Sequence, residues 1–153
     1  MPTVNYILGM NAKLYEGAIS GTDTPTAITA MTEVANVRDL TLTLEAGDAD
    51  ITTRGNSGWR ATAPTLRECT IEFEMVWKPG DTVFDAMLAA FLAGTQVELA
   101  ALDGDKATTG SQGPKGSFGV TKFDRKEGLE DAIIASVTCK LSKWDQWFKK
   151  AGA

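Results

Sequence analysis

The sequence predicts a mainly β fold of the α+β class: an antiparallel β-sandwich or partly open barrel with one flanking α-helix. Three observations lead to this prediction. Two runs alternate strongly between polar and apolar residues, one stretch has helical spacing, and no linker or repeat divides the 153 residues. Alternation places one strand face in a core and the other in water, and an amphipathic helix buries its apolar stripe against a sheet. We therefore expect a single domain over residues 1–153.

The two alternating runs are residues 37–45, VRDLTLTLE, and residues 67–77, RECTIEFEMVW. The apolar positions are Leu40, Leu42 and Leu44 in the first run, and Cys69, Ile71, Phe73, Met75 and Trp77 in the second. The polar positions are Asp39, Thr41, Thr43 and Glu45 in the first, and Glu68, Thr70, Glu72 and Glu74 in the second. The face assignment depends on strand phase, because a slip of one residue exchanges the two faces.

A long polar segment, at about residues 46–66, separates these two strands and forms an inter-strand arm. Two strands need only a few residues between them, and a long connection without secondary structure of its own is usually functional or disordered. The residues of interest on the arm are Asp48, Asp50, Thr52, Thr53, Arg54, Trp59 and Arg60. Tryptophan and arginine are enriched among interface anchors, so their side chains would suit a contact with another protein. A lid over the subunit's own core is the alternative reading of Trp59.

One helix is expected over DTVFDAMLAAFLAG, residues 81–94. Asp81 is a candidate N-cap and Gly94 a C-terminal stop. We expect the stripe of Phe84, Leu88 and Phe91 to be buried against the sheet.

Further strands are expected at residues 12–18, 95–102, 117–123 and 133–142, with turn-rich loops at 20–26 and 103–116. The C-terminal tail at 144–153 is aromatic and basic and is expected to be a separate element. Its candidate contact residues are Trp144, Trp147 and Phe148, which dock either on the subunit's own surface or on a neighbour.

Catalytic and metal-binding patterns are weak, so we expect no enzyme, no cofactor and no metal. The chain has no histidine, which removes the common triads and zinc sites. The pairs Asp48/Asp50 and Asp103/Asp105 fit solvated turns better than calcium sites, since neither continues into an EF-hand loop. The carboxylates at 68, 72 and 74 fit a polar strand face better than a glycosidase pair. The glycines at 110, 113 and 116 lack the strand-to-helix context of a phosphate loop.

Composition and charge limit the function further. A net charge of -5 and a pI of about 4.7 disfavour a conventional nucleic-acid binder. No apolar run approaches the roughly 18 residues of a membrane span, and no signal segment opens the sequence. Cys69 and Cys139 fit neither a metal spacing nor a disulfide framework and are expected to be buried free thiols. We therefore expect a protein that is cytosolic when made.

Residues 36–103 carry a resemblance to a known family. NVRDLTLTLEAGDADITTRGNSGWRATAPTLRECTIEFEMVW, followed by DTVFDAMLAAFLAGTQVELAAL, resembles the tail tube proteins (major tail proteins) of long-tailed bacteriophages. The shared features are a V-x-D-L-T-L strand, an A-D-x-T-T-R segment that enters a long loop, and an aromatic-bearing stretch. A second amphipathic strand and a helix that opens with Asp then follow.

The resemblance implies a structural virion protein that self-assembles into hexameric rings, which stack into a hollow tube for DNA ejection into the host. It implies a lumen lined by Asp39, Thr41, Thr43, Glu45, Glu72 and Glu74, and an arm that reaches a neighbouring subunit or the next ring. The implied partners are other copies, the tape-measure, tail-tip or baseplate and tail-terminator proteins, and double-stranded DNA in transit without specific binding. The implied location is the virion tail, after assembly in the host bacterial cytoplasm and without membrane insertion.

Three alternatives remain open at this point. One is an inner-tube protein of a bacterial secretion or contractile injection system. Another is a monomeric β-barrel that binds a small apolar ligand beneath the helix. In the third, the polar strand faces are simply the solvated outside of a small domain. For a tube subunit, we further expect the arm, and the loop at 103–116, to become ordered only on stacking.

Overall fold

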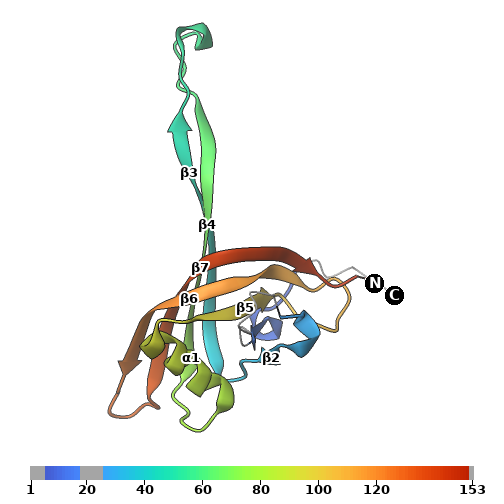
Figure 1. Cartoon of the computed structure of the whole chain (residues 1–153), viewed down its shortest axis with the longest axis vertical. Helices are drawn as coiled ribbons and strands as arrows, with labels where there is room; N and C mark the ends of the chain where they lie inside the picture. The colour runs from blue at the N-terminus through green and yellow to red at the C-terminus, as the bar shows by residue number, and fades with distance from the viewer. Residues whose placement is uncertain (1–5, 18–25, 152–153) are drawn as a thin grey trace.

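A curved seven-stranded antiparallel sheet forms the framework of the molecule, and one α-helix packs on it (Figure 1). The computed structural model describes residues 6–17 and 26–151. The strands are β1 (Lys13–Gly17), β2 (Thr32–Glu33), β3 (Val37–Asp50), β4 (Thr62–Val76), β5 (Gln96–Leu102), β6 (Gln112–Lys126) and β7 (Ile134–Lys149). The helix is α1 (Thr82–Ala93), and three short 3-10 turns are η1 (Gly9–Asn11), η2 (Ile28–Ala30) and η3 (Arg54–Asn56).

The strand order is β2-β1-β5-β6-β7-β4-β3, and the sheet does not close. Strands β2 and β3 are its two edges, and they do not pair with each other. The prediction of a mainly antiparallel β fold with one flanking helix is confirmed, and the partly open arrangement is the one observed.

The strands are longer than the sequence alternation predicts. Hydrogen-bonded pairing of β3 with β4 continues to Asp50 and Thr62, so the arm at 46–66 is a β-hairpin and the prediction of a segment without secondary structure is wrong. Strand β7 likewise runs through the segment at 144–149, which pairs with the start of β6 and is therefore not a separate element. The loop expected at 103–116 ends at Ser111, and the one expected at 20–26 lies almost wholly outside the described residues.

The main core lies on the concave face of the sheet, between the strands and α1. Its residues include Ile71, Phe73 and Met75 of β4, Leu99 of β5, Phe118 of β6 and Val137 of β7, all at most 3% exposed. Burial of each such side chain stabilises the fold by roughly 1.5–3 kcal/mol. Cys69 and Cys139 also belong to this core as free thiols, as expected. Burial raises the pKa of the Cys139 thiol to about 12.

Helix α1 begins and ends where the sequence predicts. The Asp81 carboxylate accepts hydrogen bonds from the backbone N–H groups of Val83 and Phe84 at 3.0 and 3.2 Å. Gly94 ends the helix in the left-handed conformation with φ of 69°. The buried stripe differs from the predicted one, however: it consists of Val83, Phe84, Met87 and Ala90. Phe91 is 39% exposed, because the smaller Ala90 faces the sheet.

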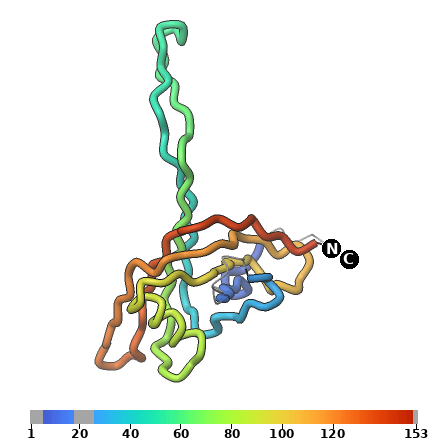
Figure 2. The backbone as a smooth tube through the Cα atoms, in the orientation of Figure 1, coloured from blue at the N-terminus to red at the C-terminus, as the bar shows by residue number. Residues whose placement is uncertain are grey.

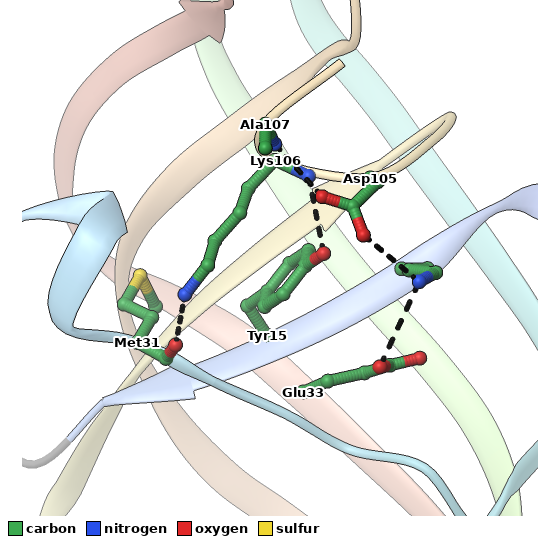
Figure 3. A network of polar contacts seen from close by, with 7 residues as sticks. Tyr15, Met31, Glu33, Asp105, Lys106 and Ala107 are labelled. Atoms are coloured by element: carbon green, nitrogen blue, oxygen red, sulfur yellow. Dashed lines mark hydrogen bonds and ion pairs between the residues drawn. The ribbon is translucent and has the colours of Figure 1, made fainter.

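A second, smaller cluster lies on the opposite face of the sheet. It contains Tyr15, Met31, Ala100 and Leu102, with Phe148 of β7 packed against it. The segment before β6 is held over this cluster by the network in Figure 3, in which Lys106 Nζ donates a hydrogen bond to the Met31 carbonyl at 2.6 Å. The Lys106 backbone N–H donates to the Tyr15 hydroxyl at 3.1 Å. None of the helices within residues 6–17 and 26–151 has the length and apolar character needed to cross a bilayer.

Candidate assembly surfaces

The predicted polar positions of β3 and β4 lie together on one face of the sheet. Cross-strand pairing places Thr41 opposite Glu72 and Thr43 opposite Thr70. The predicted lumen residues Asp39, Thr41, Glu45 and Glu72 are exposed, and Thr43 and Glu74 are half-buried. The structure therefore brings this predicted set onto a single surface, which we call the polar face.

Strands β6 and β7 extend the polar face beyond the predicted residues. A shallow depression of about 410 Å³ is lined by Asp39, Thr41, Glu72, Glu74, Lys122, Asp124, Ser136 and Thr138, among others. Register explains this grouping, because Thr138 pairs with Glu72 on one side and with Lys122 on the other. The β7 residues could have been found from the sequence, since Ser136 and Thr138 alternate with the buried Ala135, Val137 and Cys139. The face is mixed in charge: Lys122 pairs with Asp124 at 3.2 Å.

The arm stands clear of the rest of the molecule as a two-stranded hairpin (Figure 2). Where it leaves the body, the register shifts between Ala46 and Asp48. Glycine avoids a close contact at this irregularity: a Cβ atom at position 47 would lie 2.7 Å from Thr65 Oγ1, so the Thr65 side chain would have to move. The hairpin is therefore continuous with the sheet at its base.

The tip of the arm, residues 51–61, is held by its own hydrogen bonds. The Asp50 carboxylate accepts from the Thr52 N–H at 2.9 Å, and the pKa of Asp50 is lowered by its hydrogen bonds with Thr52. Thr52 Oγ1 accepts from the Ala61 N–H at 2.9 Å and donates to the Ala61 carbonyl at 3.2 Å. Chain reversal is made possible by Ser57 and Gly58, with φ of 53° and 84°. The carboxylate expected at a solvated turn thus stabilises the tip.

Several apolar side chains of the hairpin are exposed. Trp59 is 76% exposed, Leu66 85% and Ile51 54%. Arg54 and Arg60 belong to the same tip and are exposed as well. The lid reading of Trp59 does not apply to this structure, since a side chain on a projecting tip covers no core. Exposed apolar groups gathered with arginine are typical of a surface that another protein covers.

The predicted aromatic contact residues near the C-terminus divide between two environments. Phe148 packs against the second cluster of its own subunit. Trp144 and Trp147 are each 45% exposed, and Trp147 Nε1 donates a hydrogen bond to Gln112 Oε1 at 3.1 Å. Only the two tryptophans therefore offer apolar area to a partner.

The acidic pair Asp103 and Asp105 has a structural task. Asp103 Oδ1 accepts from the Gln112 N–H at 2.9 Å, and Asp105 accepts from Lys13 Nζ at 3.0 Å and from the Ala107 N–H at 2.8 Å (Figure 3). The backbone bond from Ala107 and the ammonium of Lys13 hold the pKa of Asp105 below its ordinary value. Within the described ranges, no group of three or more Cys, Asp or Glu side chains is arranged to hold a metal ion.

The space between β1 and the edge strand β3 is a groove of about 680 Å³. It is lined by β1 residues such as Lys13 and Leu14 on one side and by Val37, Leu40 and Leu42 of β3 on the other. Leu40 is 36% exposed there. Unpaired strand edges beside exposed leucines are places where another chain can add to a sheet.

An open sheet with two free edges, a projecting hairpin and a separate polar face is the form of a structural subunit that associates with other chains. The chain belongs to the phage tail tube protein family, whose model matches residues 18–142. It is accordingly a structural protein of the phage tail tube. Comparison with curated proteins gives no match.

Solved structures with the same fold come from tails. One is the tail of an empty gene transfer agent particle with C6 symmetry, with a TM-score of 0.70 and 18% identity over 94% of this chain and 98% of that one. Another is the native gene transfer agent virion, with a TM-score of 0.66 and 17% identity over 92% and 98%. A third is the SPP1 tail tube, with a TM-score of 0.71 and 15% identity over 96% and 81%. At these identities the likeness establishes the fold.

Proposed function

We propose that this chain assembles into hexameric rings that stack into the hollow tube of a phage tail, through which double-stranded DNA passes to the host. The observation that carries the proposal is the likeness to a tail with C6 symmetry, which extends over 94% of this chain. Family membership supports it independently. The location that follows is the virion tail, after assembly in the host bacterial cytoplasm.

The polar face is the surface suited to the lumen. Its predicted lumenal residues include four carboxylates: Asp39, Glu45, Glu72 and Glu74. Carboxylates repel the phosphates of DNA, while nucleic-acid binding needs Lys and Arg to neutralise them. A tube lined in this way lets DNA pass without holding it. The role is therefore structural and non-enzymatic.

The arm is the element suited to contacts between subunits or rings. Its predicted interface residues Asp48, Asp50, Thr52, Thr53, Arg54, Trp59 and Arg60 all lie on the outer hairpin. Asp50 and Thr52 order the tip, whereas Trp59 and the two arginines are free to contact a partner. At the ends of the tube, the partners would be tail-tip or baseplate and tail-terminator proteins, with a tape-measure protein in the lumen. Trp144 and Trp147 offer a second contact surface.

Electron microscopy of the concentrated, purified protein, with light scattering on the same sample, tests the proposal. We expect hollow tubes or stacked rings with sixfold symmetry. Trp59→Ala should reduce tube formation at least tenfold, while its free energy of unfolding stays within about 0.5 kcal/mol of the wild type because the side chain is on the surface. Leu129→Ala is the matched control, since Leu129 is fully exposed on a loop. A monodisperse monomer at every concentration would contradict the proposal.

A further inference from the structure

A groove of about 640 Å³ runs between α1 and the beginning of β5. Small side chains form its helical wall, namely Ala86, Ala89, Ala90 and Ala93, and Gln96 and Val97 of β5 form the other side. Four alanines on one helix leave room close to the backbone. One acidic side chain, Glu16 of β1, also lines the groove.

Glu16 is largely buried, and its carboxyl has no partner among the residues that the structure describes. The residue is 7% exposed, and its carboxyl forms no hydrogen bond or ion pair with any other residue in 6–17 or 26–151. Loss of hydration raises the pKa of Glu16. Among the described residues, no side-chain oxygen is fully enclosed without a hydrogen-bond partner, so the Glu16 carboxyl keeps access to the groove. A partly dehydrated carboxylate that opens into a groove can pair with a cation that enters the groove.

The exposed side of α1 is apolar as well. Leu92 is 74% exposed and Phe91 39% exposed, and Asp85 is the one charged residue of the helix. A helix that is apolar on all sides is usually buried on all sides. The groove and the adjacent helix surface thus combine one negative charge with apolar area.

The tip of the arm has the complementary chemistry. It presents the exposed side chains of Trp59, Arg54 and Arg60. The arm also projects from one end of the molecule, while α1 lies at the other end (Figure 1). Copies stacked in the same orientation would therefore bring the tip of one towards the groove of the next.

We propose that the groove between α1 and β5 is the docking site for the arm tip of a second copy, with an arginine of the tip paired to Glu16. This inference rests on the proposed tube function and names the surface that receives the arm. Arginine suits the site because its planar guanidinium retains its charge when buried and pairs with a carboxylate through two hydrogen bonds. Trp59 covers the exposed side of α1 beside this pair.

The first test compares charge variants by the critical concentration for tube formation. We expect Glu16→Gln, and the double variant Arg54→Gln/Arg60→Gln, each to raise it at least tenfold. Glu130→Gln, on an exposed loop, is the matched control and should leave it unchanged. The Glu16→Gln subunit should be at least as stable as the wild type, which separates loss of docking from loss of folding. Unchanged critical concentrations in both variants would overturn the docking site.

The second test locates the contact by disulfide formation between copies. Ser57→Cys at the tip and Ala89→Cys in the groove are introduced together; the native thiols are buried and do not compete. Oxidised tubes should yield covalently linked chains, whereas the pair Ser57→Cys and Lys126→Cys should not. Wild-type tubes without linkage of the Ala89→Cys pair overturn the docking site and leave the tube function standing. Wild-type protein that never assembles contradicts the tube function and the docking site together.

Discussion

Glu45 of β3 lies directly opposite Glu68 of β4, so two carboxylates of the same sign form a cross-strand pair on the polar face. Like charges in this position destabilise an antiparallel sheet. The surrounding face carries further carboxylates, including Glu72 and Glu74. The repulsion between these carboxylates does not stabilise a free subunit. In a channel, the same carboxylates would keep a polyanion from binding to the wall.

Removing one charge of this pair should stabilise the free subunit. We predict that Glu68→Gln raises the free energy of unfolding by about 0.5 kcal/mol, measured by urea denaturation at low salt. The gain should shrink at high salt because the repulsion is screened. Glu130→Gln serves as the control for loss of a single surface charge. A stability loss in Glu68→Gln at both salt concentrations would show that the pair is not repulsive.

The N-cap of α1 gives a second prediction. Asp81→Ala removes the acceptor for the N–H groups of Val83 and Phe84, and we expect a loss of about 1 kcal/mol in the free energy of unfolding. Asp81→Asn keeps an oxygen in the same place and should retain most of the stability. Equal losses in the two variants would mean that the carboxylate acts through its charge and not through these hydrogen bonds.

Burial of Glu16 predicts a particular dependence on pH. The pKa of its carboxyl is raised in the folded chain above the ordinary value of 4.5, so between the two values the folded state holds a proton that the unfolded state has lost. The free energy of unfolding therefore falls as pH rises between these two pKa values. Below pH 4.5 the carboxyl is protonated in both states, and Glu16 causes no dependence on pH. Asp50 and Asp105 have lowered pKa values and act in the opposite direction.

The difference between the wild type and Glu16→Gln isolates the contribution of Glu16. We expect the variant to gain stability relative to the wild type as pH rises above 4.5, and the gain to level off above the raised pKa. Denaturant unfolding at a series of pH values measures this. A difference that is constant across the series would contradict the predicted titration.

The arm should change its dynamics on assembly. Among the described residues, the hydrogen bonds that hold its tip lie within the hairpin, such as that from the Ile51 N–H to the Ala61 carbonyl at 3.0 Å. We predict that amide hydrogens in residues 51–61 exchange quickly in free subunits and at least tenfold more slowly in tubes, as measured by hydrogen exchange. Amides of β5, which is buried in the sheet, should serve as the internal standard. Equal protection of the arm in both forms would exclude ordering on assembly.

Sequence patterns predicted the strands and the helix that bury one face in the core and expose the other. The alternation in β3 and β4 identified both strands and their polar face, because a period of two directly reports a half-buried strand. The helix cap at Asp81 was also predicted from the sequence, because a capping side chain bonds to the backbone only a few residues away. The buried stripe of α1 was not predicted correctly. Ala90 faces the sheet in place of the larger Phe91, and only the packing of the helix determines which of the two is buried.

The outer arm and the end of β7 could not be found in this way. The outer arm is held by backbone pairing without a core, so its side chains have no reason to alternate. In β7, the period is broken by register shifts opposite Gly116 and Ser117 of β6, and Phe148 packs on the opposite face from Val137. The groove with Glu16 depends on how α1 sits on β5, which no local pattern encodes.

The arm and α1 lie at opposite ends of the molecule, and this has a consequence for any stack of copies in one orientation. Such a stack is polar: one terminus presents unoccupied hairpins, and the other presents unoccupied helices. The two ends of the stack therefore present chemically different surfaces. A protein that initiates or terminates growth by binding one end does not fit the other. The asymmetry of a single subunit therefore determines the direction in which the stack grows.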